Sequence, residues 1–247
     1  MPLREEFERS GQWLFRWRSY MPLIPLVVTL LALGDFRYPR GSHALNEQWD
    51  VLCLLISLSG LWIRALVIGY APAGTSGRNT KQGQIAETVN QTGMYALVRH
   101  PLYVGNYLMW LGILLIPLNA WVAVVVSMFY WLYYERIMFA EEEYLRGKFG
   151  EEYVRWAERT PAFLPRLRGW VKPALPFSWR NVAKREYSGL FAIALLFPVM
   201  NAAANYAAVR DPRPDPWQVV LLVVGFVTYV VLRTLKRKTQ VLQVEGR

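Results

Sequence analysis

The chain has 247 residues, of which 54% are hydrophobic and 15% aromatic, and its formal net charge is +10. This composition excludes an ordinary soluble domain and predicts an all-α, polytopic integral membrane protein. The basic residues stand in short segments between apolar runs, whereas nucleic-acid binding needs them on a soluble face, so we expect no nucleic-acid partner. With one cysteine, two histidines and no HExxH or CxxC pattern, the sequence predicts no metal site.

Six apolar runs have about the ~20-residue length that crosses a bilayer as a helix. They lie at about residues 20–35, 49–70, 102–118, 120–139, 187–208 and 216–234. Because so few residues separate the third run from the fourth, these two runs form an antiparallel helical hairpin. We therefore predict about six transmembrane helices, with the start of the third and the end of the fourth on the same side of the membrane.

The segment after the fourth run is predicted to stay helical. Apolar side chains recur at helical spacing between residues 140 and 160, and the sequence TPAFLP at 160–165 ends the helix. Such a helix would lie beside the polar residues at the end of the hairpin.

Lysine and arginine are distributed unevenly along the chain. Twenty-two of them lie in segments 1–20, 71–100, 140–186 and 233–247, and four lie in segments 36–48 and 207–215. The positive-inside rule therefore predicts that both termini and the site lie on the cytoplasmic side, in a bacterium at the cytoplasmic membrane. The charge excess is also expected to attract anionic lipid.

Two polar clusters flank the predicted hairpin: Arg99 and His100 precede it, and Glu141 and Glu142 follow it. Charged groups are costly near hydrocarbon and usually serve a function there, so the pair of clusters predicts a site. Each cluster also has a purely structural interpretation, in which the arginine extends to the interface and the glutamates are solvated.

Several motifs in this region occur in a fixed order. Residues 92–105 read TGMYALVRHPLYVG, and they are followed by a Glu-Glu pair at 141–142, by Phe-Gly at 149–150, by Tyr153 and by the proline-bounded segment 161–165. This set resembles the isoprenylcysteine carboxyl methyltransferase and phospholipid methyltransferase superfamily of integral membrane enzymes, and within it a bacterial branch like the lipid A phosphate methyltransferases is considered.

The resemblance covers about residues 88–166 and implies three parts. Residues 1–87 would form two N-terminal membrane helices and a basic cytoplasmic loop, and residues 88–166 would form the methyltransferase core. Residues 167–247 would form a basic linker, two further membrane helices and a basic tail.

The resemblance implies S-adenosylmethionine as the cofactor. The implied cofactor-binding residues are Tyr95, Arg99, His100, Pro101, Tyr103, Gly105, Asn106, Glu141 and Glu142, and the implied catalytic residues are Arg99, His100 and Glu142. Arg99 suits the carboxylate of this cofactor, and Glu141 or Glu142 suits its ammonium group or ribose hydroxyls. Gly105 would allow adenosine to approach the backbone closely.

The methyl acceptor is expected to be a membrane lipid or lipid-linked group. An anionic acceptor needs only a cation to hold it, whereas an amine needs a base such as His100. Carboxyl methyltransferases of this family carry an arginine where Val154 stands, so a lipid phosphate such as that of lipid A is considered beside a prenylcysteine carboxylate. The predicted substrate-binding residues are Arg78, Lys81 and Arg155.

Three other functions stay open: an aminolipid N-methyltransferase, a membrane reductase that uses NADPH, and a non-enzymatic membrane protein of the same outline. The oligomeric state and the role of the last two membrane helices also stay open.

Overall fold

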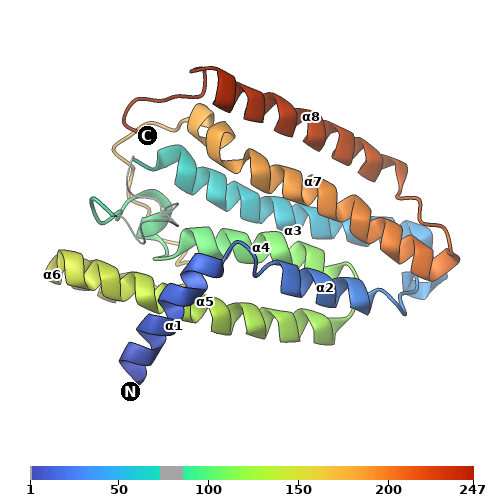
Figure 1. Cartoon of the computed structure of the whole chain (residues 1–247), viewed down its shortest axis with the longest axis horizontal. Coiled ribbons are helices and arrows are strands. Elements are labelled where there is room, and N and C mark those ends of the chain that lie inside the picture. Colours follow the sequence, from blue (N-terminus) through green and yellow to red (C-terminus); the bar gives the residue numbers. More distant parts are fainter. Residues whose placement is uncertain (1, 73–85) are drawn as a thin grey trace.

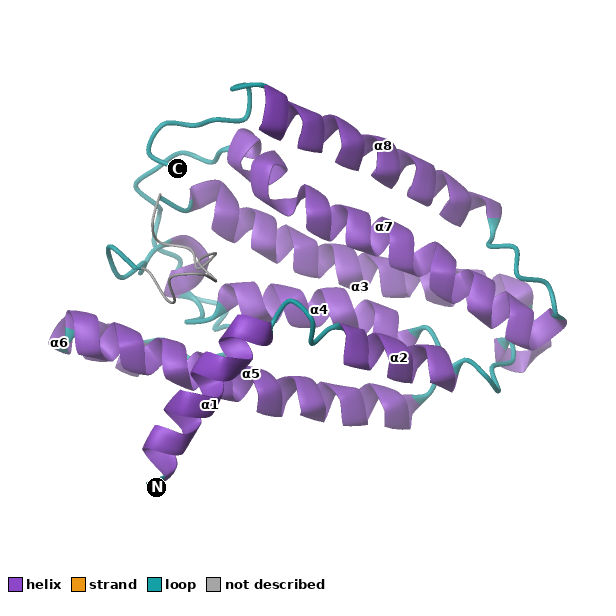
Figure 2. Cartoon of the chain, viewed as in Figure 1, coloured by secondary structure: helices purple, strands orange, loops and turns teal. Residues whose placement is uncertain are grey.

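The computed structural model describes residues 2–72 and 86–247, and its regular structure within these ranges is helical (Figure 2). The α-helices are α1 (Leu3–Trp17), α2 (Leu23–Ala32), α3 (His43–Tyr70), α4 (Pro101–Leu115), α5 (Ala120–Phe149), α6 (Glu151–Arg159), α7 (Trp179–Val209) and α8 (Pro216–Lys238). Two short 3₁₀ turns, η1 (Pro39–Gly41) and η2 (Gly93–Ala96), lie between them. The predicted all-α class is confirmed.

Four of the described helices, α3, α5, α7 and α8, are long and apolar enough to cross a bilayer. The apolar helices α2 and α4 are shorter, with 10 and 15 residues. Exposed valine and leucine side chains cover the outward faces of the helices, for example on α8. Such an apolar surface is suited to contact with the hydrocarbon of a bilayer. The protein is an all-α integral membrane protein, and the predicted six crossings would require α2 and α4 to span as well.

The helices lie side by side in one bundle, with α3 between α4 and α7, and α8 against α7 (Figure 1). Both termini and α6 lie at the same end of this bundle (Figure 1). Two helices begin earlier than hydropathy predicted, α3 at His43 and α7 at Trp179. Serine side chains cap both starts: Ser42 accepts from the Leu45 N–H and Ser178 from the Asn181 N–H, each at 3.3 Å.

The hairpin is formed by α4 and α5, as predicted. Asn119 caps α5 by accepting a hydrogen bond from the Val122 N–H at 3.2 Å. Gly150, with a φ of 54°, ends α5, and α6 follows directly. The predicted helical segment after the fourth run is therefore confirmed, with a break at Gly150.

Glycines allow α3 and α4 to pack closely. A Cβ atom at Gly60 would overlap the Gly105 carbonyl oxygen and lie 2.6 Å from the Met109 nitrogen. A Cβ atom at Gly112 would overlap the Ser57 hydroxyl. Small residues at such positions bring two membrane helices into backbone contact. This contact places the start of α4 beside the end of α3, where the candidate site lies.

Candidate active site

Residues 93–100 are held in place by the segment that follows α6. The Arg99 N–H donates to the Pro161 carbonyl at 2.8 Å, and the Gly93 N–H donates to the Val171 carbonyl at 2.8 Å. The Arg166 guanidinium donates to the Ala96 carbonyl at 2.8 and 3.1 Å. The proline-bounded segment therefore does more than end a helix, because it fixes the backbone that carries Arg99.

The two predicted polar clusters meet across the hairpin. Arg99 Nη1 lies 3.1 Å from Glu142 Oε2, and His100 Nε2 lies 2.8 Å from Glu142 Oε1. The side chains of Arg99 and Glu142 are about 20% exposed, and His100 is buried. One carboxylate thus orients both basic side chains at the edge of the bundle.

Glu141 forms the second contact between the clusters. The Tyr103 hydroxyl donates to Glu141 Oε2 at 3.0 Å, and the His100 and Tyr103 rings stack with centroids 5.7 Å apart. The Tyr130 hydroxyl donates to the Tyr103 carbonyl at 2.8 Å. The side chains at the start of α4 are therefore held in fixed positions by α5.

Four of these side chains, Arg99, His100, Tyr103 and Glu141, line a cavity of about 390 Å³. Its walls come from the end of α1, α3, η2, α4, α5 and α7. The charged residues on the walls are Arg18, Arg64, Arg99, Arg185, Glu141 and Glu186. The volume lies within the usual range of small-molecule sites.

Four of these charged wall residues lie outside the set predicted from the sequence: Arg18, Arg64, Arg185 and Glu186. Arg64 donates to both carboxylate oxygens of Glu186, at 2.7 and 2.8 Å, and to Asn106 Oδ1 at 2.6 Å. An arginine inside an apolar helix is itself a signal of function, and it could have identified Arg64. Its partner could not be found from pattern alone, because Glu186 lies 122 residues away.

The first helix, α1, was not predicted. It packs along α5, where Gly11 lies against the backbone of Arg136 and the Tyr133 hydroxyl donates to the Leu14 carbonyl at 2.6 Å. An ion pair between Arg4 and Glu143 joins the same two helices. The end of α1 thereby brings Phe15 to the cavity wall.

A smaller pocket of about 50 Å³ adjoins the main cavity and shares Tyr95, Arg99, His100 and Glu141 with it. Tyr153 and Trp156 from α6 line this pocket. Three buried polar atoms at these side chains form no hydrogen bond: Arg99 Nε, the Tyr153 hydroxyl and Trp156 Nε1. Because unpaired buried polar atoms are costly, they need a polar partner here, which a bound ligand or a water molecule would supply.

Burial and the negative charge of Glu142 raise the pKa of the Tyr153 phenol well above its ordinary value. The hydroxyl therefore keeps its proton at physiological pH and is available as a hydrogen-bond donor.

The structure brings most of the predicted site residues to the cavity. Tyr95, Pro101, Tyr103 and Asn106 line it together with Arg99, His100 and Glu141, and Glu142 lies directly behind Arg99 and His100.

Two predicted residues lie elsewhere. A Cβ atom at Gly105 would lie 2.6 Å from Arg64 Cγ and 2.8 Å from the Gly60 carbonyl oxygen, so this glycine serves the α3–α4 contact and is not on the cavity wall. Arg155 lies on the exposed face of α6 and lines neither pocket. Arg78 and Lys81 lie outside the described residues.

Comparison with known proteins gives several matches. The family model for phospholipid methyltransferases matches residues 51–152. The cobalt-zinc-cadmium resistance protein CzcN of Cupriavidus metallidurans is 31% identical over 66% of this chain and 78% of its own length. The protein-S-isoprenylcysteine O-methyltransferase of Mus musculus is 31% identical over 50% of this chain and 47% of its own length. The corresponding enzyme of Saccharomyces cerevisiae is 26% identical over 60% of this chain and 64% of its own length.

The chain therefore spans about half the length of the mouse relative. No solved structure is significantly similar to it. The matched region contains both polar clusters and the hairpin between them. On these matches, the chain belongs to the isoprenylcysteine carboxyl methyltransferase and phospholipid methyltransferase superfamily of integral membrane methyltransferases.

Proposed function

We propose that this protein is an S-adenosylmethionine-dependent O-methyltransferase that acts at the membrane on an anionic lipid or lipid-linked group. The observation that carries the proposal is the cavity whose walls carry Arg99, Glu141 and the Arg64–Glu186 pair. Such a cavity has polar groups of both signs for a zwitterionic cofactor and separate cations for an anionic acceptor.

The residues present fit the proposed cofactor. The guanidinium of Arg99 suits a carboxylate, and Glu141 or Glu142 suits an ammonium group or ribose hydroxyls. Arg99 Nε, the Tyr153 hydroxyl and Trp156 Nε1 are donors without an acceptor, and their side chains line the smaller pocket. They could donate hydrogen bonds to the polar groups of the cofactor. When bound, the cofactor supplies a methyl group already activated by a positively charged sulfur.

The protein's own residues then have two tasks, which are to align the acceptor and to exclude water. Packed aromatic rings, such as Tyr103 against Tyr134 at 4.9 Å between centroids, close the α5 side of the site. An anionic oxygen acceptor carries no proton at neutral pH, so the transfer needs no general base. His100 is held between two carboxylates, at 2.8 Å from Glu142 and 3.8 Å from Glu141, and we assign it a positioning role.

The charges on the wall favour an anionic acceptor, because four arginines face two glutamates in the main cavity. Arg18 and Arg185 replace Arg155 as the described candidates for holding the acceptor, since both line the cavity and Arg155 does not. The O-methyltransferase names of the mouse and yeast relatives agree with this chemistry. CzcN is named for metal resistance, and its name does not identify a methyl acceptor.

An apolar groove of about 570 Å³ supports a lipid acceptor. It lies between α3, α7 and α8, it is lined by side chains such as Trp62 and Leu190, and it meets the main cavity at Glu186. A lipid chain in this groove would place its headgroup beside Arg64 and Arg185.

A transfer assay with radiolabelled cofactor tests the proposal, using the purified protein and three acceptor classes: lipid phosphates, prenylcysteine carboxylates and aminolipids. We expect label in an anionic acceptor that depends on Arg99. Transfer to the aminolipid alone would overturn O-methylation, and failure to bind the cofactor in a direct titration would overturn the methyltransferase proposal itself.

The groove gives a separate prediction. Leu190→Trp is expected to raise KM for a long-chain acceptor by about tenfold, equivalent to losing about two buried methylene groups, and to leave a short-chain acceptor unaffected. Leu195→Trp, on an exposed part of the same helix, is the matched control. Equal KM values for both variants would contradict the assignment of the groove.

The proposal includes six crossings, with α2 and α4 spanning and with both termini and the cavity on the cytoplasmic side. The twenty-two to four distribution of basic residues supports this orientation. We expect a membrane-impermeant maleimide to label the Pro212→Cys variant in intact cells and to label Arg155→Cys only after permeabilisation. Native Cys53 is buried and gives little background. The reverse pattern would overturn the orientation.

A further inference from the structure

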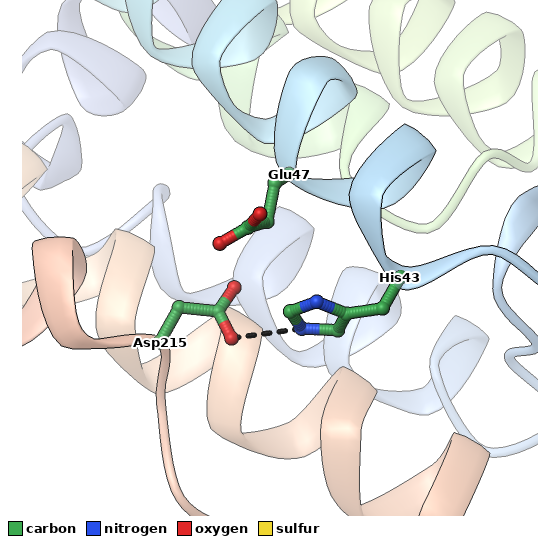
Figure 3. Close-up of side chains that lie close together, drawn as sticks. All are labelled: His43, Glu47 and Asp215. Atoms are coloured by element: carbon green, nitrogen blue, oxygen red, sulfur yellow. Dashed lines mark hydrogen bonds and ion pairs between the residues drawn. The ribbon is translucent and has the colours of Figure 1, made fainter.

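A second polar cluster lies between the start of α3 and the residue before α8. His43, Glu47 and Asp215 point toward one another in Figure 3, and one ligand atom from each lies within 4.8 Å of the others. His43 Nε2 lies 2.9 Å from Asp215 Oδ1. No described residue forms a hydrogen bond or ion pair with the Glu47 carboxylate, although it faces this pair.

This cluster is far from the candidate active site. Glu47 and Arg64 lie on the same helix, and seventeen residues of α-helix separate them by roughly 25 Å. Because α3 is long enough to cross the bilayer, the two sites lie at opposite ends of a membrane-spanning helix. A ligand at one site therefore does not touch the other.

Two buried carboxyl groups lie directly behind the cluster. The Asn201 amide nitrogen donates to Asp50 Oδ2 and to Asp215 Oδ2, each at 3.0 Å. Both aspartates are buried, with 1% and 5% of their surfaces exposed. Among the described residues no lysine or arginine forms an ion pair with either carboxylate. Two adjacent buried carboxylates that no lysine or arginine neutralises are costly, so the fold is suited to receive positive charge here.

Three buried oxygens in the same network lack a hydrogen-bond donor: Asp50 Oδ1, Asn46 Oδ1 and Gln218 Oε1. Asn46 and Asp50 lie on the same face of α3 as His43, at i+3 and i+7. Asn46 and Gln218 both donate through their amide nitrogens to Asp50 Oδ2, at 3.3 Å. Unpaired acceptors at this depth need a donor or a cation, and a positively charged ligand would satisfy them.

We propose that His43, Glu47 and Asp215 form a binding site for a divalent transition-metal ion of the zinc class. One imidazole and two carboxylates are a ligand set that Zn²⁺ and Co²⁺ accept, with water completing the coordination. The sequence predicted no metal site, because the two carboxylates that join His43 are not recognisable as ligands until the chain folds.

The surrounding contacts orient the ligands for this role. Asn201 and the Asp215 N–H, which donates to Asn201 Oδ1 at 2.9 Å, hold Asp215 so that Oδ1 faces His43. The Tyr38 ring packs edge-on against the imidazole at 5.2 Å between centroids. Such supporting contacts are typical of built metal sites. The bound ion would fasten the α7–α8 connection to the start of α3.

Titration of the full-length protein, purified in detergent and treated with a chelator, tests this site. We expect one Zn²⁺ bound per chain by calorimetry, and a visible absorption band when Co²⁺ is added instead. His43→Ala is expected to weaken Zn²⁺ binding by at least about tenfold and to abolish the Co²⁺ band. His43 is exposed, so this variant is expected to fold.

The Asp211→Asn variant is the matched control. This carboxylate lies in the same connection, pairs with Arg213 and is not a ligand, so its removal is expected to leave Zn²⁺ affinity unchanged. Glu47→Gln should weaken binding like His43→Ala. Absence of stoichiometric binding in the unmodified protein, or equal affinities for His43→Ala and Asp211→Asn, would overturn the proposal. These readouts are independent of methyl transfer.

Discussion

Glu142→Gln is expected to reduce the affinity for S-adenosylmethionine by about 100-fold or more and to reduce methyl transfer accordingly. Glu142 contacts both Arg99 and His100, at 3.1 and 2.8 Å. Removing one partner of a mostly buried ion pair typically costs about 3–5 kcal/mol of folding stability. A loss of about 2.7 kcal/mol in cofactor binding corresponds to the expected factor of 100. The neutral amide keeps the shape of the side chain but removes the negative charge that holds the guanidinium and the imidazole in place.

Calorimetric titration with the cofactor measures this effect directly. Glu151→Gln is the matched control, because this exposed glutamate lies at the start of α6 and lines neither pocket. Its affinity is expected to equal that of the unmodified protein. If Glu142→Gln bound the cofactor as tightly as the control, the proposed role of the Arg99–Glu142–His100 contacts would be wrong.

Gly60→Ala is expected to destabilise the bundle by about 1–3 kcal/mol, the usual cost of overpacking. The added methyl group would overlap the Gly105 carbonyl oxygen and lie 2.6 Å from the Met109 nitrogen. Both atoms belong to the backbone of α4, so only a shift of the whole helix can relieve the contact. That shift would also disturb the packing of the Arg64 stem against Gly105, and methyl transfer should fall with stability.

Thermal unfolding in detergent is the measurement, with an expected fall of about 2–4 °C for each kcal/mol lost in a chain of this size. Gly147→Ala is the matched control, and it is expected to raise the melting temperature. A Cβ atom at Gly147 meets open space within a helix, so alanine is expected to stabilise by about 0.5–1 kcal/mol. A Gly60→Ala protein that melted no earlier than the unmodified chain would contradict the close contact of α3 and α4.

Several parts of the fold were predictable because they depend on local pattern. The short connection between two apolar runs was sufficient to predict the α4–α5 hairpin. Helical spacing predicted the segment that became the end of α5 and α6. The all-α class followed from composition. Hydropathy placed the starts of α3 and α7 too late, because their first turns are polar and are stabilised by serine caps rather than by lipid.

The candidate site was predictable only in part. The ordered motifs identified Arg99, His100, Tyr103 and Glu141, which the structure brings to one cavity. They could not show that Gly105 lies at the α3–α4 contact, because a glycine required for helix contact and one required for ligand approach look alike in a sequence. They also could not show that Arg155 faces away from the cavity, since two faces of a short helix differ only once its packing partner is known.

The sequence by itself determined that this is a helical membrane protein, which motifs surround its hairpin, and to which superfamily those motifs point. These properties reside in apolar length and in the order of residues, both of which are local. Only the tertiary structure decided that Arg64 pairs with Glu186, that the end of α1 helps to enclose the cavity, and that His43 meets Asp215 at the other end of α3. Partners separated by 122 and 172 residues are chosen by the packing of helices, and no local pattern records which faces will meet.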